Sequence, residues 1–347
     1  MTLSTTLKRL FALLCSAALI AWFVLGGDRE AQLAALGQRL ARIDGLQLAG
    51  LIAAFAATYL LRAGRIFDEF SHFAAPPTQP LRADPPAEGA GKVLGRPGDF
   101  SAGHVRFASI LRLSLIHNAM VNVLPFRSGE ATFPILLNRW FGVPTARAIA
   151  ALLWLRLQDA FVVLALAALV WPDLPAALRA MWIAAVLLAA WGIPHWARNH
   201  DALLDQASHS KFGRLVTKFR SALAESTHGA GRSWLWTLAN WSLKLVAQAW
   251  ALSLLLGASL QSGLAGAMGV ELAAILPIQG VAGFGTYEAG GAALLRTHGI
   301  MLADGLQACL ILHLFVIACA LSAGALAAVL LPGQSPASSS TTENTHA

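Results

Sequence analysis

The fold of this chain is decided by the stretch Leu124-Pro125-Phe126-Arg127-Ser128-Gly129-Glu130. Apolar helical sequence lies on both sides of it, yet the stretch holds a proline, a glycine and charges of both signs. A similar stretch, Leu276-Pro277-Ile278-Gln279-Gly280, is followed by Gly283, Gly285 and Glu288. Each pattern predicts a helix that is broken by proline and glycine and restarts near an acidic residue. Inside a membrane, such irregular backbone is tolerated only where protein or a water-filled cavity satisfies its polar groups.

The composition is that of a membrane protein. Of the 347 residues, 56% are hydrophobic and only 12% are charged, whereas soluble proteins carry about 25% charged residues. A soluble domain could not bury this much apolar surface, so we predict an all-α polytopic membrane protein. The net charge is +7, and its basic residues lie in loops beside apolar runs, which favours an anionic lipid surface over nucleic acid. Cys15, Cys309 and Cys319 lie in apolar runs without metal-ligand spacing, so we expect no disulfide framework, no metal and no cofactor.

Long apolar runs predict about six full transmembrane helices, at residues 10–26, 46–61, 145–171, 176–193, 234–256 and 302–331. Two shorter helical pairs, 107–141 and 263–297, contain the breaks. The helix predicted after the first break, 129–141, would be about 20 Å long at about 1.5 Å per residue. A hydrocarbon core is about 30 Å thick, so we expect both pairs to be re-entrant hairpins.

The charges of the loops predict the topology. The N-terminus and the loops 62–106 and 195–232 are basic, which places them on the cytoplasmic side, with Arg62 and Arg65 marking the cytoplasmic end of the second span. The C-terminus is then cytoplasmic as well, and the two hairpins enter from opposite sides.

This topology makes the two hairpins an inverted repeat. Gly142 aligns with Gly299, and Arg156 aligns with His313 at the same offset. A chance match between Ala- and Leu-rich helices is the alternative. Matched interrupted segments of this kind are typical of a transport site between repeats. We treat residues 1–333 as one transmembrane domain with a flexible, proline-rich cytoplasmic loop at 71–106, followed by a disordered tail at 334–347.

Polar and ionisable side chains lie deep in the apolar runs and at the breaks. The candidates for a substrate or proton pathway are Asn118, Asn122, Arg127, Glu130, Arg156, Asp159, Lys244, Glu271, Glu288 and His313. A charged side chain that faces lipid at the bilayer centre costs about 2.5–3.5 kcal/mol, so we expect these groups to face inward and to pair. Arg156 and Asp159 are three residues apart and can pair on one helix face. The alternative is that the charges are structural ion pairs that hold the bundle together.

Prolines and glycines at the breaks are the candidate hinges, namely Pro125, Gly129, Pro277, Gly280, Gly283 and Gly285. The breaks also carry a family resemblance. Residues 122–130 (NVLPFRSGE), 156–159 (RLQD), 276–277 (LP) and 283–288 (GFGTYE) resemble the lysylphosphatidylglycerol synthase transmembrane-region family, also called the flippase-like domain family. The resemblance covers about residues 10–331. The chain departs from the family pattern at Thr132-Phe133-Pro134, where a basic residue is usual, and at Leu155, where an acidic residue is frequent.

The resemblance implies a protein of the bacterial cytoplasmic (inner) membrane that translocates or handles a lipid between leaflets. The lipid would be a phospholipid, a hopanoid or a lipid-linked head group, with an anionic head group favoured. Full-length synthases add a soluble aminoacyl transferase domain, and this chain stops after the last predicted span, so we expect a stand-alone member. Two alternatives are a membrane enzyme acting on a lipid-linked phosphate and an accessory protein that binds a soluble partner through loop 71–106 or 195–232.

Overall fold

The computed structural model describes residues 29–71, 105–171, 174–199, 230–275 and 280–331, and also residues 217, 220 and 224. Within these ranges every regular element is a helix, which confirms the predicted all-α class for the part described. The predicted first span, 10–26, the tail 334–347 and nearly all of the loop 71–106 lie outside the described residues.

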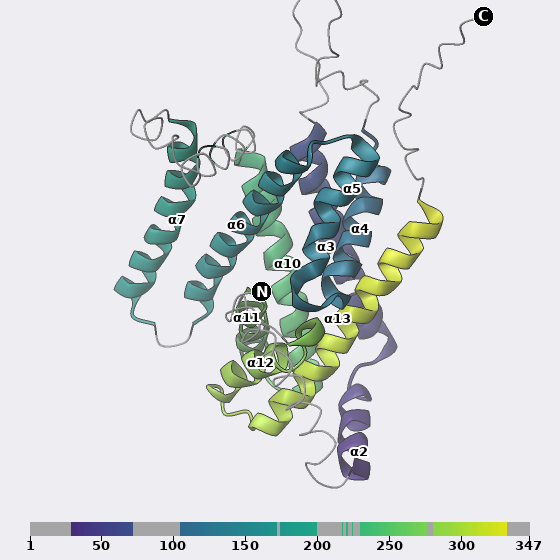
Figure 1. Ribbon diagram of the computed structural model, residues 1–347. Helices are drawn as coiled ribbons and strands as arrows, with labels where there is room; N and C mark the ends of the chain where they lie inside the picture. Colours follow the sequence, from purple (N-terminus) through teal and green to yellow (C-terminus); the bar gives the residue numbers. More distant parts are fainter. Residues whose placement is uncertain are drawn as a thin grey trace, which may run out of the picture.

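Most helices lie close to the predicted ranges (Figure 1). In chain order the elements are α2 (Arg29–Leu40), α3 (Gly45–Ser71), α4 (Phe107–Val123), η2 (Pro125–Ala131), α5 (Thr132–Phe141), α6 (Thr145–Val170), α7 (Ala176–Arg198), α10 (Ala230–Leu256), α11 (Leu260–Ile275), η3 (Val281–Gly283), α12 (Thr286–Arg296) and α13 (Leu302–Leu330). The main departure is α3, which continues to Ser71 instead of ending at residue 61. Its added turns bury Ala63, Ile66 and Phe70 on one face, so packing extends the helix past its two arginines.

Among the described residues, four helices are long and apolar enough to cross a membrane: α3, α6, α7 and α13. A fifth span results if α10 and α11, which meet at a bend of 119°, are taken as one broken span. The chain is therefore a multi-pass helical protein with four or five candidate spans in its described part. The prediction of about six spans included residues 10–26, which lie outside that part.

The first break separates α4 from α5. Leu124 is extended between Val123, which ends α4, and Pro125, which begins the 3-10 helix η2. Proline suits this position because the first N–H groups of a helix have no acceptor within the helix. The predicted break at Pro125 is therefore present in the structure.

Close packing of Gly129 explains why a tight 3-10 turn follows the proline. A Cβ at Gly129 would lie 2.6 Å from Val121 Cα and 2.6 Å from the carbonyl carbon of Met120, so only glycine allows η2 to approach α4 this closely. The prediction of a helix starting at residue 129 was wrong in this detail. The turn runs to Ala131, and α5 begins at Thr132.

The second break precedes α12. Residues 276–279, which include Pro277, lie outside the described residues, and the chain resumes with an extended Gly280 and the short η3. Gly285 has a φ of 87°, a backbone conformation that residues other than glycine rarely adopt. Its backbone N–H donates to Glu288 Oε2 at 2.7 Å, so the carboxylate caps the start of α12.

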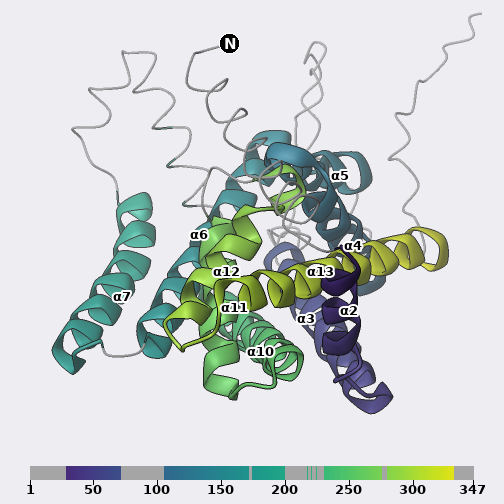
Figure 2. The same cartoon turned by 90° about the horizontal axis from the view of Figure 1, so that it is seen from below.

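The two breaks meet although they are far apart in sequence. η2 contacts η3, while α4 and α5 lie in the upper part of the bundle and α12 in the lower part (Figure 1). α11 and α12 pack closely through small residues, because Gly269 faces Gly290 and Gly291. In contrast, α7 stands at the edge of the bundle in both views (Figures 1 and 2).

Candidate functional site

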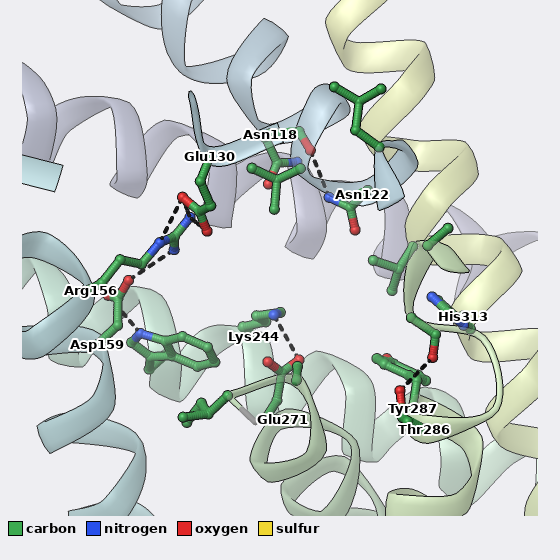
Figure 3. Close-up of a pocket in the computed structure, with 18 of the residues that line it drawn as sticks. Asn118, Asn122, Glu130, Arg156, Asp159, Lys244, Glu271, Thr286, Tyr287 and His313 are labelled. Carbon is green, nitrogen blue, oxygen red and sulfur yellow. Dashed lines mark hydrogen bonds and ion pairs between the residues drawn. The ribbon is translucent and has the colours of Figure 1, made fainter. Parts of the chain in front are cut away.

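A polar cavity of about 220 Å³ lies where the two breaks meet. Its walls come from α3, α4, α6, α10, α11, α12, α13 and the residues around η2 and η3 (Figure 3). The polar and ionisable side chains that line it are Arg62, Asn118, Asn122, Glu130, Arg156, Asp159, Lys244, Glu271, Thr286, Tyr287 and His313. Segments that are remote in sequence thus bring most of the predicted candidates to one cavity within an apolar bundle.

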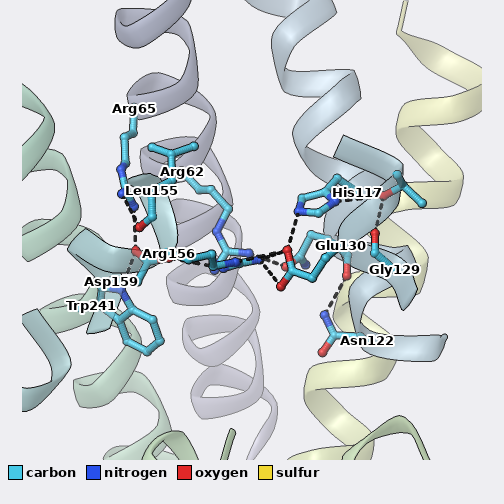
Figure 4. Close-up of polar contacts among 12 residues, drawn as sticks. Arg62, Arg65, His117, Asn122, Gly129, Glu130, Leu155, Arg156, Asp159 and Trp241 are labelled. Atoms are coloured by element: carbon cyan, nitrogen blue, oxygen red, sulfur yellow. Dashed lines mark hydrogen bonds and ion pairs between the residues drawn. The ribbon is translucent and has the colours of Figure 1, made fainter. Parts of the chain in front are cut away.

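Arg156 joins two carboxylates at one wall of the cavity (Figure 4). Its Nη2 lies 2.8 Å from Glu130 Oε1, and its Nη1 lies 3.2 Å from Asp159 Oδ2. Asp159 also accepts from Arg65 Nη1 at 2.6 Å and from Trp241 Nε1 at 3.0 Å. Asp159 is therefore fully engaged by α3, α6 and α10, whereas Glu130 depends mainly on Arg156.

His117 fixes the start of α5 beside this wall. Thr132 Oγ1 donates to the carbonyl oxygen of Gly129 at 2.7 Å, so it accepts from His117 Nδ1, which is 2.9 Å away. His117 Nε2 then lies 3.7 Å from Glu130 Oε2. The imidazole is buried and serves to hold η2 and the Glu130 side chain in place.

A second ion pair crosses the cavity from α10 to α11. Lys244 Nζ lies 2.7 Å from Glu271 Oε1 and 4.7 Å from the centre of the Trp241 ring. Gln248, one turn after Lys244, donates its Nε2 to the same Glu271 oxygen at 2.7 Å. Glu271 is buried with both partners in place.

The third pair lies behind the glycine-rich second break. His313 Nδ1 donates to Glu288 Oε1 at 2.7 Å, and the imidazole stacks on Tyr287 with ring centres 4.2 Å apart. His313 lines the cavity, but Glu288 is completely buried behind it. A Cβ on Gly283 would lie 3.3 Å from His313 Cε1, so the small residue leaves room for the ring.

Arg62 is the cavity cation that the sequence analysis assigned wrongly. We expected the span to end before Arg62 and Arg65, but both lie inside α3, where Arg62 lines the cavity and Arg65 is buried against α6. Arg62 Nη1 donates to Asn118 Oδ1 at 2.6 Å. In the described part of the chain, no carboxylate lies within ion-pair distance of Arg62. The spacing of Ala63, Ile66 and Phe70 was the signal that the helix continues past residue 61.

Some of the remaining predicted residues lie at the cavity, and others lie outside the described residues. Asn122 donates its Nδ2 to the Asn118 carbonyl oxygen at 2.7 Å and lines the cavity. Gly280 and Gly283 lie at its edge, and Pro125, Gly129 and Gly285 shape the breaks beside it. The side chain of Arg127 and all of Pro277 lie outside the described residues. Within the described ranges, no group of three or more His, Cys, Asp or Glu side chains is placed to hold a metal ion.

The charges of the cavity nearly balance. Four cations lie in or beside it, namely Arg62, Arg65, Arg156 and Lys244, against three carboxylates that are all ion-paired. This leaves Arg62 as a cation whose hydrogen-bonding partner is a neutral amide. Such an arrangement can accept one anionic oxygen group without breaking any of the ion pairs.

A family comparison covers the part of the chain that forms this cavity. The family model for the lysylphosphatidylglycerol synthase TM region matches residues 9–324, a range that includes both breaks and all the residues that line the cavity. No curated protein and no solved structure matches the chain. Because the family model covers most of the 347 residues, the chain belongs to the lysylphosphatidylglycerol synthase transmembrane-region family.

Proposed function

We propose that this protein moves a lipid between membrane leaflets and that the polar cavity binds the phosphate of the lipid head group. The observation that carries the proposal is Arg62, a guanidinium that lines the cavity beside Asn118 and lacks a carboxylate partner among the described residues. A guanidinium can bind two oxygens of one phosphate in parallel. An anion at this position would complete the charge balance of the cavity.

The surroundings of Arg62 support a head group rather than a purely structural ion pair. Asn118 and Asn122 both lie on α4 and line the cavity with their side-chain amides. Arg156, which lines the same cavity, pairs with Glu130. A charge inside an apolar bundle is costly unless it is paired or hydrated. Arg62 borders a cavity of about 220 Å³ and has no carboxylate partner among the described residues, which favours an anionic ligand.

An inverted repeat would supply alternating access to this cavity. We define the first broken unit as α4, η2, α5 and α6, and the second broken unit as α11, η3, α12 and α13. Their helices have similar lengths in the same order: 17, 10 and 26 residues in the first unit, and 16, 11 and 29 in the second. Glu130 pairs with Arg156 in one unit, and Glu288 pairs with His313 in the other. These matches support two re-entrant hairpins that enter from opposite faces.

The membrane and its orientation are part of the same proposal. The basic loops favour a bacterial cytoplasmic membrane with both termini on the cytoplasmic side. A soluble partner at loop 71–106 or 195–232 would meet the protein on that side. The lipid itself would be an anionic phospholipid, a hopanoid or a lipid-linked head group.

The test is head-group translocation in proteoliposomes that contain a fluorescent phosphatidylglycerol. Arg62→Gln should slow translocation about tenfold, because a hydrogen bond to a charged group contributes about 1.5–3 kcal/mol. Arg112→Gln is the matched control, since Arg112 lies on α4 outside the cavity and donates to the Ala328 carbonyl oxygen at 3.1 Å. Equal rates for the wild type and Arg62→Gln would contradict the proposal. A chemically altered lipid found by mass spectrometry would favour an enzyme instead, and a loss caused only by deleting 71–106 would favour an accessory protein.

A further inference from the structure

A second cavity lies on another face of the helices that form the first. Its volume is about 470 Å³, and α6, α7 and α10 line it. On α6, Ala160 borders the polar cavity and the next residue, Phe161, borders this groove. On α10, Trp241 borders the polar cavity and Leu238 borders the groove. Two neighbouring helices thus separate a polar cavity from an apolar groove.

The groove lies beside α7. Only 6% of the apolar window of α7 is buried in the protein, and the helix stands at the edge of the bundle (Figures 1 and 2). The side chains that line the groove are apolar or aromatic with one exception. An unfilled apolar space loses dispersion contacts on all of its walls, so a hydrocarbon chain is the favourable occupant.

The exception is Arg198, which lies at one end of the groove, in the last turn of α7. Its Nε donates to the Pro194 carbonyl oxygen at 3.2 Å, and no carboxylate pairs with it in the described part of the chain. Arg220 lies at the same end and donates to the carbonyl oxygen of Asn199. The groove is therefore cationic at one end and apolar along the rest of its length.

An aromatic residue lies near the cationic end of the groove. Trp191 lines the groove, and its ring stacks on His195 with centres 4.8 Å apart. Tryptophan and arginine together are typical of the level at which lipid head groups lie. The sequence of chemistry along the groove, from cation to aromatic to aliphatic, matches that of a phospholipid from phosphate to acyl chain.

We propose that this groove binds one bilayer phospholipid, with an acyl chain between α6, α7 and α10 and the phosphate on Arg198. The site is separate from the polar cavity and does not depend on the transport proposal. It would add lipid contacts to the direct contacts by which α7 packs on α6.

The test uses the full chain in nanodiscs with a phosphatidylglycerol whose acyl chain carries a photoactivatable diazirine. Adducts mapped by mass spectrometry should concentrate on groove residues of α6, α7 and α10. Arg198→Gln should reduce the adduct yield about fivefold. The matched control is Arg179→Gln, at the other end of α7, where Arg179 Nε donates to the Ala168 carbonyl oxygen at 3.0 Å. A diacylglycerol probe without phosphate should label the wild type as weakly as the phospholipid labels Arg198→Gln.

A second variant tests the apolar part of the groove. Ala190→Trp places a large ring in the groove and should abolish the adducts, whereas Ala185→Trp, at an exposed position of α7 outside the groove, should leave them unchanged. Equal labelling by the two probes, or equal labelling of the Ala190→Trp and Ala185→Trp variants, would overturn the proposal. So would cross-links that place residues 10–26 of the chain itself in the groove.

Discussion

The first and second broken units carry the same kind of pair, a carboxylate and a basic side chain, in different surroundings. In the first unit, the side chains of Glu130 and Arg156 are 21% and 32% exposed. In the second unit, the side chains of Glu288 and His313 are 0% and 5% exposed, and Glu288 also caps α12. The comparison shows that the same kind of pair can be partly exposed to a cavity in one unit, whereas in the other unit it is buried and its carboxylate also binds a backbone N–H.

The breaks themselves differ in the same way. η2 packs directly on α4, and the contact at Gly129 is so close that α4 leaves no room for a Cβ there. The second break relies on glycine conformation, with φ values of 86° at Gly283 and 87° at Gly285. We therefore expect stability to depend on the carboxylate in the second unit and on packing in the first.

The largest effect is expected for Glu288→Ala. The substitution removes the acceptor of both His313 Nδ1 and the Gly285 N–H, and breaking a buried pair costs about 3–5 kcal/mol. Thermal unfolding of the purified protein in detergent should show a large loss of stability. Glu288→Gln, which keeps an acceptor oxygen, should lose less. A Glu288→Ala variant as stable as the wild type would remove the contrast between the two units.

Gly129→Ala should have the next largest effect. An added methyl group would lie 2.6 Å from Val121 Cα, and overpacking costs about 1–3 kcal/mol. Gly283→Ala is the comparison in the other unit and should cost about 1–2 kcal/mol, since its left-handed conformation is strained by a Cβ while its nearest neighbour is 3.3 Å away. The same unfolding measurement decides the order, and a greater loss for Gly283→Ala would reverse our assignment of packing to the first break.

Glu130→Ala should destabilise the protein by only about 1 kcal/mol, because the pair is partly exposed. Arg156 also keeps Asp159 as a partner at 3.2 Å. The variant should nevertheless alter head-group translocation, since it changes the charge of the cavity. A stability loss as large as that of Glu288→Ala would show that the first pair is as structural as the second.

The smallest change in stability is expected for Arg156→His, which gives the first unit the carboxylate–histidine pair of the second. Histidine changes its charge near neutral pH, whereas arginine remains charged. Translocation by the variant should therefore be retained at about pH 5.5 and reduced at about pH 8, while the wild type keeps its rate across this range. The measurement is the proteoliposome assay at both pH values. A variant without this pH dependence would show that Arg156 does not contribute through its charge.

Local sequence predicted the elements of the fold well. Apolar runs predicted α6, α7 and α13 close to their observed bounds, and Pro125 predicted the first break. Asn118, Glu130, Arg156, Asp159, Lys244, Glu271 and His313 were selected because ionisable and amide groups in apolar helices must face inward. Arg156 and Asp159 pair as their spacing of three residues predicted.

The sequence did not predict which residues on different helices contact one another. Arg62 was assigned to a loop because charge after an apolar run normally marks the end of a span, but Ile66 and Phe70 pack in one cluster with α4 and α6 and extend α3 past that point. The sequence predicted that Glu288 faces inward and pairs, but it did not predict that its partner is His313, since the two residues lie on different helices. The pairing of Asp159 with Arg65 and Trp241 also joins three separate helices.

The sequence by itself determined an all-helical, membrane-spanning chain with two broken segments and a set of inward-facing charges, because hydrophobicity, proline and glycine act over a few residues. Only the tertiary structure decided which charge pairs with which, and that Arg62 is left with an amide partner at the cavity. Those outcomes depend on how helices distant in sequence pack together, and local patterns carry no record of that packing.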